Sequence, residues 1–97
     1  MIDLQVREEG GEIVCQGSVG IDWRVLQRID EDSFPFLGSL LPYADTMFNS
    51  RQVVRLLREI ADPSVRRILG HEVVEEIERL CAQVERGTLL YLWFLGD

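Results

Sequence analysis

The segment LPYADTMFNSRQ, residues 41–52, gathers the polar side chains that are best suited to chemistry. Tyr43 can donate a hydrogen bond, Asp45 can act as a base or contact a divalent cation, and Thr46 adds a hydroxyl group. Polar residues gathered in a loop are typical of binding and catalytic sites. Tyr43, Asp45 and Thr46 therefore form a candidate loop for ligand binding or catalysis.

The second half of the same segment is explained by the start of a helix. Asn49 is a preferred N-cap residue, and Gln52 follows it at the spacing of a capping box. Phe48 and Val53 flank this pair at the positions of a hydrophobic staple. The polar side chains of the candidate loop can also hydrogen-bond the backbone of the turn that leads into the helix. The pattern favours a structural role for this segment over a catalytic one.

Other catalytic arrangements are poorly represented in the chain. His71 is the only histidine, so a histidine-based metal site within one chain is not expected. The glutamates of residues 72–78 are spread around a helix and are expected to form its solvated face. The arginine stripe of residues 51–58 can bind an acidic group or pair with Glu59. No metal and no cofactor is predicted.

The composition describes a small acidic chain. Its 97 residues carry a net charge of −7, which disfavours nucleic acid as a partner and suits a basic protein. Asp30, Glu31 and Asp32 form an acidic turn that could dock on a basic protein surface. All ten basic residues are arginine, a bias typical of GC-rich bacterial genomes.

Segments for membrane insertion or export are not apparent in the sequence. No apolar run approaches the roughly 20 residues of a membrane span, and the first residues lack the basic-then-apolar order of a signal peptide. Cys15 and Cys81 occupy apolar positions and are expected to be buried free thiols. These features predict a cytoplasmic protein that is not bound to a membrane.

The periodicity of apolar residues predicts one α+β domain over residues 1–97. The N-terminal hairpin and the closing strand are expected to form a small three-stranded sheet packed against three to four helices. The predicted elements are a hairpin at 1–18, a helix at 22–29, an irregular connection at 34–48, helices at 50–61, 63–69 and 71–86, and a strand at 87–97.

The closing strand, GTLLYLWFLGD, is apolar on both of its faces. Leu92 and Phe94 point one way, and Tyr91 and Trp93 point the other. A strand of this kind is either buried on both sides or has one face that meets a partner. Tyr91 and Trp93 are therefore candidate anchors for a protein partner.

A longer pattern surrounds the candidate loop. The residues FPFLGSLLPYADTMFNSRQ, followed by VVRLLREI, fit F-P-x-L-G…P-Y-x-D-T-x-F-N-x-x-Q over about residues 34–60. This pattern resembles small uncharacterised bacterial, actinobacterial-like proteins that also close with an apolar strand. The resemblance implies a shared fold and a shared surface around Tyr43, Asp45 and Thr46, and it implies no particular reaction.

Three hypotheses for function follow from these features. The leading one is a small non-catalytic protein-binding module, for example an immunity-type inhibitor that covers the surface of a basic partner. Tyr91 and Trp93 would anchor this contact, and the acidic turn would set its on-rate and specificity. The alternatives are a small enzyme or ligand-binding protein that uses the candidate loop, and a homo-oligomeric structural subunit that pairs through the closing strand.

Overall fold

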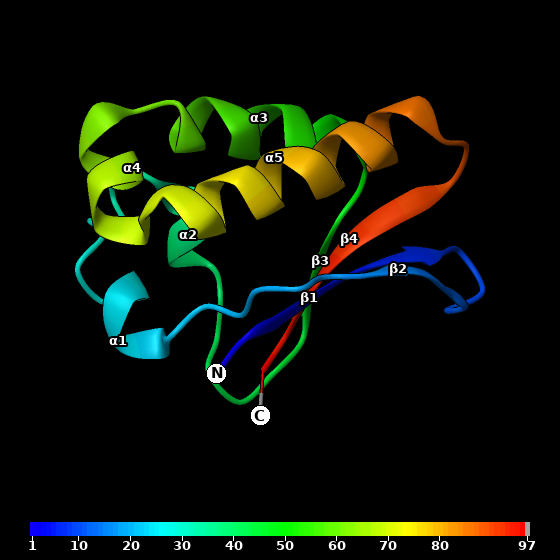
Figure 1. Cartoon of the computed structure of the whole chain (residues 1–97), viewed down its shortest axis with the longest axis horizontal. Coiled ribbons are helices and arrows are strands. Elements are labelled where there is room, and N and C mark those ends of the chain that lie inside the picture. The colour runs from blue at the N-terminus through cyan, green and yellow to red at the C-terminus, as the bar shows by residue number, and fades with distance from the viewer. Residues whose placement is uncertain (97) are drawn as a thin grey trace.

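An antiparallel sheet with helices packed on one face makes up the computed structural model, which describes residues 1–96 (Figure 1). Asp97 lies outside the described residues. The strands are β1 (Asp3–Glu8), β2 (Ile13–Gln16), β3 (Thr46–Phe48) and β4 (Leu90–Leu95). The helices are α1 (Trp23–Leu26), α2 (Pro35–Gly38), α3 (Ser50–Ile60), α4 (Pro63–Leu69) and α5 (His71–Arg86).

The sheet has four strands in the order β2-β1-β4-β3. The α+β class, the N-terminal hairpin and the participation of the closing strand are confirmed. The predicted number of three strands is wrong, because residues 46–48 form β3 inside the segment that was expected to be irregular. The strand β3 pairs with β4, so that Thr46 lies opposite Phe94 and Phe48 lies opposite Leu92. Three residues are too few for alternation to reveal a strand in the sequence.

Helix starts follow the predicted capping residues. The Asn49 side chain accepts hydrogen bonds from the backbone of Arg51 and Gln52, and Gln52 completes the capping box. Asp62 caps α4, and Pro63 occupies its first position. Gly70, with φ of 88°, separates α4 from α5. Within residues 1–96, no helix combines the length and the apolar character needed to cross a bilayer.

Two short helices differ from the predictions. The helix expected at 22–29 is helical only to Leu26, and the chain continues in tighter turns, with the Ile29 amide bonded to the Leu26 carbonyl. One helical turn, α2, lies in the connection that was expected to be irregular. Glu59 explains α2, because its carboxylate accepts hydrogen bonds of 2.9 Å from the backbone of Phe36 and of Leu37. Glu59 therefore caps α2 instead of pairing with the arginine stripe.

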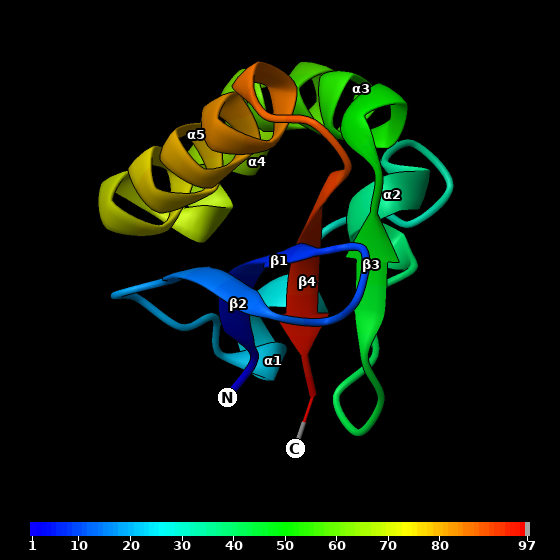
Figure 2. The same ribbon diagram turned by 90° about the vertical axis from the view of Figure 1, so that its right-hand side faces the viewer.

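The core lies between the sheet and the helices α3, α4 and α5 (Figure 2). Leu92 and Phe94 of β4 are buried on this side, together with Leu56 of α3 and Ile77 of α5. Each such side chain contributes roughly 1.5–3 kcal/mol on leaving water. The side chains on the helix-facing side of the sheet are therefore part of the core.

The two cysteines differ in their surroundings. Cys81 is buried in α5, and burial raises the pKa of its thiol to about 12. Cys15 is only partly buried, and its Sγ lies 3.6 Å from Nη1 of Arg79. The prediction of a free thiol is confirmed at both positions, and the prediction of full burial is wrong for Cys15. Cys15 is less buried than expected because it lies on β2, an edge strand with a neighbouring strand, β1, on one side only.

Glu76 of α5 is buried, 5% exposed, although the sequence pattern placed it on a solvated face. Its carboxylate accepts hydrogen bonds from the Ser18 amide, from the Ser18 hydroxyl at 2.6 Å and from the Val19 amide at 3.2 Å. Arg79 pairs with the other oxygen at 2.6 Å. Burial disfavours the ionised form, but the hydrogen bonds from Ser18 and Arg79 outweigh it and lower the pKa of Glu76. Glu76 therefore fastens the β2–α1 connection to α5.

Replacing Glu76 by alanine is expected to reduce the free energy of unfolding by about 2–3 kcal/mol, because buried donors lose a charged acceptor. Glu85→Ala is the matched control, since Glu85 is an exposed carboxylate of the same helix. It should change the free energy of unfolding by less than about 0.5 kcal/mol. Urea denaturation measures both variants, and equal effects would contradict the anchoring role.

The contribution of Glu76 is also expected to depend on pH. Because folding lowers its pKa below the ordinary value of 4.5, its stabilising effect is complete above that pH. The effect is lost as the pH falls below this value and through the folded pKa. The difference in stability between the native protein and Glu76→Gln should therefore narrow in acid, as measured by urea denaturation at several pH values. A difference that widens in acid would refute this assignment.

Candidate functional site

The face of the sheet that points away from the helices carries aromatic and apolar side chains, and we call it the open face. Cross-strand pairing defines its two central rows. One row runs Gln16, Gln5, Trp93, Met47, and the other runs Ile13, Arg7, Tyr91. Tyr91 and Trp93 are half-buried, whereas Ile13 and Met47 are more than half exposed. The sequence-based placement of Tyr91 and Trp93 on one face, opposite Leu92 and Phe94, agrees with this register.

A chain of polar contacts holds Arg7 in place on the open face. The Arg7 guanidinium carbon lies 4.6 Å from the centre of the Trp93 ring, in cation–π geometry. Arg7 Nε donates to Gln5 Oε1 at 2.8 Å, and Gln5 Nε2 donates to Gln16 Oε1 at 2.6 Å. Gln5 is only 8% exposed because these neighbours cover it. Arg7, Gln5 and Trp93 therefore form one ordered surface.

The indole of Trp93 has an unmet hydrogen bond. Its Nε1 is buried and has no hydrogen-bond partner, and it is the one buried polar side-chain atom of residues 1–96 in this state. A buried donor without an acceptor costs roughly 1–3 kcal/mol. Because this nitrogen is itself buried, a partner's acceptor cannot reach it while the neighbouring side chains keep their positions, and Trp93 offers a partner its ring surface.

The acidic turn is not part of the open face. It connects α1 to α2 on the helix side of the molecule, where a Cβ built on Gly38 of α2 would lie 2.5 Å from the Glu31 Cβ. Asp30 serves the turn itself, because its carboxylate accepts the Asp32 amide at 3.1 Å and the Ser33 hydroxyl at 2.7 Å. These bonds, that from Ser33 first, lower the pKa of Asp30. The structure thus separates the acidic turn from Tyr91 and Trp93.

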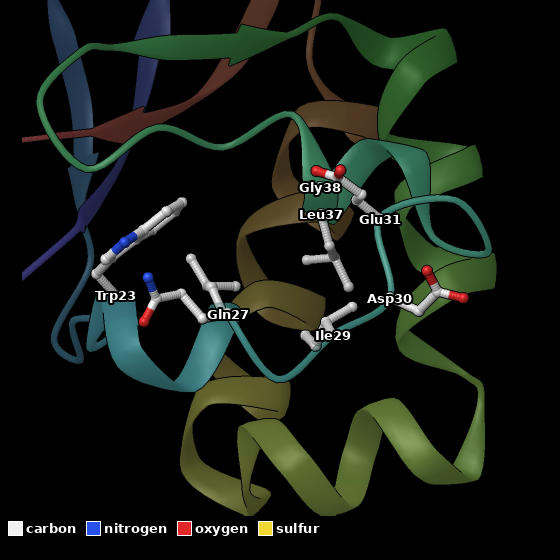
Figure 3. A pocket seen from close by; sticks show the side chains of 8 residues that line it. Trp23, Gln27, Ile29, Asp30, Glu31, Leu37 and Gly38 are labelled. Atoms are coloured by element: carbon white, nitrogen blue, oxygen red, sulfur yellow. The ribbon is translucent and has the colours of Figure 1, made fainter.

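The acidic turn instead borders a cavity of about 480 Å³ between α1 and α2 (Figure 3). Trp23 of α1 and Gln27, the residue that follows α1, line it on one side, and Leu37 and Gly38 line it from α2. Asp30 and Glu31 lie on the side opposite Trp23, and the Asp30 carboxylate points away from the cavity. The cavity therefore combines an aromatic wall, an apolar floor and an acidic rim.

The candidate loop has a largely structural environment. Tyr43 is 83% exposed, so its ring projects into solvent. Asp45 is exposed, and Thr46 is the first residue of β3, paired with Phe94. Within the described residues, no set of three or more histidine, cysteine, aspartate or glutamate side chains could hold a metal ion. The helix start at Asn49 accounts for the polar residues that follow the loop.

Comparison with known proteins does not assign this arrangement to a family. No family model, curated protein or solved structure matches the chain. The resemblance carried by residues 34–60 therefore stays a prediction. The open face and the cavity are the two candidate sites of this chain.

Sequence patterns alone did not identify Arg7, Gln5 or Trp23 as functional candidates. Arg7 and Gln5 were visible as the polar positions of the alternating segment IDLQVR. Their importance comes from the pairing of β1 with β4, which sets Gln5 opposite Trp93 and Arg7 opposite Tyr91. The pairing of segments more than 80 residues apart has no local signal in the sequence.

The contact between Arg7 and Trp93 predicts a spectroscopic change. In a Trp23→Phe background, where Trp93 is the only indole, Arg7→Ala should shift the fluorescence maximum to longer wavelength because water gains access to the ring. Arg55→Ala, an exposed arginine of α3, is the matched control and should leave the maximum in place. An unchanged spectrum in Arg7→Ala would show that Arg7 does not shield Trp93.

Proposed function

We propose that this protein is a non-catalytic protein-binding module that uses the open face of its sheet. The observation that carries the proposal is the adjacency of Arg7, Tyr91 and Trp93 on the face without helices. A sheet face that carries exposed Ile13 and Met47 as well is an apolar surface with a polar edge. Such surfaces are typical of sites that bind another protein.

The three central residues suit strong local binding. Tryptophan, tyrosine and arginine are the residue types most enriched among positions that dominate protein–protein affinity. Arg7 is already held by Gln5 and by the Trp93 ring, so little of its conformational freedom remains to be lost on binding. The partner can then bury Trp93 and Tyr91 as anchors, with Arg7 giving directional hydrogen bonds.

Charge supports a basic partner. The net charge is −7, and Glu8 at the end of β1 is followed by Glu9 and Glu12 in the β1–β2 turn next to the open face. These carboxylates would accelerate association with a basic surface, while the acidic turn at residues 30–32 adds to the long-range field. An immunity-type inhibitor that covers a basic protein is the concrete form of this proposal. We place it in the cytoplasm, where free thiols such as Cys15 and Cys81 persist.

The proposal predicts that Trp93→Ala and Tyr91→Ala each weaken partner binding at least about tenfold, as expected for central anchors. Tyr43→Ala is the matched control, because it removes an exposed tyrosine of the candidate loop. The tagged protein is used to capture partners from its source cells, and quantitative mass spectrometry compares the variants. The dissociation constant of the purified partner is then measured for each variant whose thermal unfolding is unchanged.

Two outcomes would contradict the proposal. Binding that survives Trp93→Ala and Tyr91→Ala but is lost in Tyr43→Ala would transfer the site to the candidate loop of Tyr43, Asp45 and Thr46. Concentration-dependent dimerisation that Trp93→Ala abolishes, with no other partner captured, would instead favour the homo-oligomeric subunit. Sedimentation velocity over a range of protein concentrations distinguishes this last case.

A further inference from the structure

The cavity between α1 and α2 has an acidic rim with no basic residue in its lining. Its lining is Trp23, Leu26, Gln27, Ile29, Asp30, Glu31, Leu37 and Gly38. Two arginines lie close in sequence: Arg24 is paired with Asp22 at 2.9 Å, and Arg28, between Gln27 and Ile29, is exposed and is not part of the lining. Within residues 1–96, the Glu31 carboxylate makes no hydrogen bond or ion pair. Asp30 is hydrogen-bonded within its own turn, so Glu31 is the acidic side chain of the lining that is available to a ligand.

The remainder of the cavity is apolar and aromatic. Leu26, Ile29 and Leu37 are each less than 10% exposed and form the floor. Trp23 forms a wall opposite the acidic rim (Figure 3). An indole face attracts cations, and an apolar floor accommodates an alkyl chain. The volume of about 480 Å³ falls in the range of roughly 300–1,000 Å³ that is usual for small-molecule sites.

Gly38 determines how the acidic rim is held. A Cβ at this position would lie 2.5 Å from the Glu31 Cβ and 2.8 Å from the Glu31 Cα. Only glycine therefore lets the acidic turn lie directly against α2. Glu59 fixes α2 in turn by capping its first amides. The acidic rim is thus held at the cavity by packing against a fixed element.

We propose that this cavity binds an aliphatic cation, that is, an ammonium or guanidinium group at the end of an alkyl chain. The alkyl chain lies on Leu26, Ile29 and Leu37, and the cationic end lies between the Trp23 ring and the Glu31 carboxylate. Free alkylamines and the side chains of arginine or lysine share this chemistry. This cavity is separate from the open face, and binding in it does not depend on the function proposed for that face.

The test uses pentylguanidinium as the probe and NMR titration of the labelled protein as the measurement. We expect saturable binding with a dissociation constant of about 1 mM, which is typical of a ligand this small. The largest shifts should fall on the Trp23 indole and the Gln27 side-chain amide. Neutral 1-pentanol should bind at least about tenfold more weakly, because it lacks the charge that Glu31 recognises. Equal affinity for the two probes would overturn the proposal.

Variants test the roles of the named residues. Glu31→Gln should weaken pentylguanidinium binding about tenfold, since the charged acceptor is lost. Asp32→Asn is the matched control, because it removes the same charge from the same turn outside the lining, and it should weaken binding less than about twofold. Trp93→Ala should have no effect, which separates this site from the open face. Equal weakening by Glu31→Gln and Asp32→Asn would indicate general attraction to an acidic surface and would overturn the site.

Two further probes distinguish the source of the cation. Agmatine represents free alkylamines, and N-acetyl-arginine methylamide represents an arginine side chain within a polypeptide. Tighter binding of agmatine would assign the cavity to a free amine, and tighter binding of the blocked arginine would assign it to a basic polypeptide. Either result with the Glu31 dependence supports the site, and binding of neither probe overturns it.

Discussion

The antiparallel pairing of β1 with β4 is the constraint on which the rest of the structure depends. It joins the two ends of the chain over six residue pairs, from Asp3 opposite Leu95 to Glu8 opposite Leu90. It also makes these two strands the centre of the sheet, so that β2 and β3 add at the edges. One face of the pair enters the core, and the other becomes the open face. A shift of one residue in this register would exchange the two faces.

Carboxylates from the long helices hold the connecting segments onto this frame. Glu76 of α5 binds the chain between β2 and α1 at Ser18, and Glu59 of α3 caps α2. Each replaces water as the acceptor for backbone amides that regular structure leaves unpaired. Segments that would otherwise be loosely attached thereby acquire a defined position. The cavity between α1 and α2 depends on both attachments, because its two walls belong to the segments that they fasten.

The two candidate sites differ in shape and in charge. The open face offers aromatic and apolar area around an ordered Arg7, which suits a large partner surface. The cavity offers a small concave volume bordered by negative charge, which suits a single cationic group. They lie on different sides of the molecule, so the protein contact proposed for the sheet would leave the cavity available.

Much of the local structure was determined by the sequence itself. Apolar alternation defined the hairpin and the closing strand, and Asn49, Asp62 and Gly70 set helix boundaries that the structure confirms. These features depend on residues within a few positions of one another, where side-chain and backbone chemistry act directly. The alternation of residues in β4 likewise separates Tyr91 and Trp93 from Leu92 and Phe94, and this separation does not depend on the partner strand.

The tertiary structure alone decided which distant residues meet. The strand β3, the burial of Glu76 and the capping of α2 by Glu59 each require a contact across many residues of sequence. The contact of Arg7 with Trp93 and the packing of the acidic turn against Gly38 also join distant residues. As a result, the acidic turn borders the cavity and lies apart from Tyr91 and Trp93. Such contacts form because packing and chain closure favour them collectively, and no local pattern of residues encodes the register that brings them together.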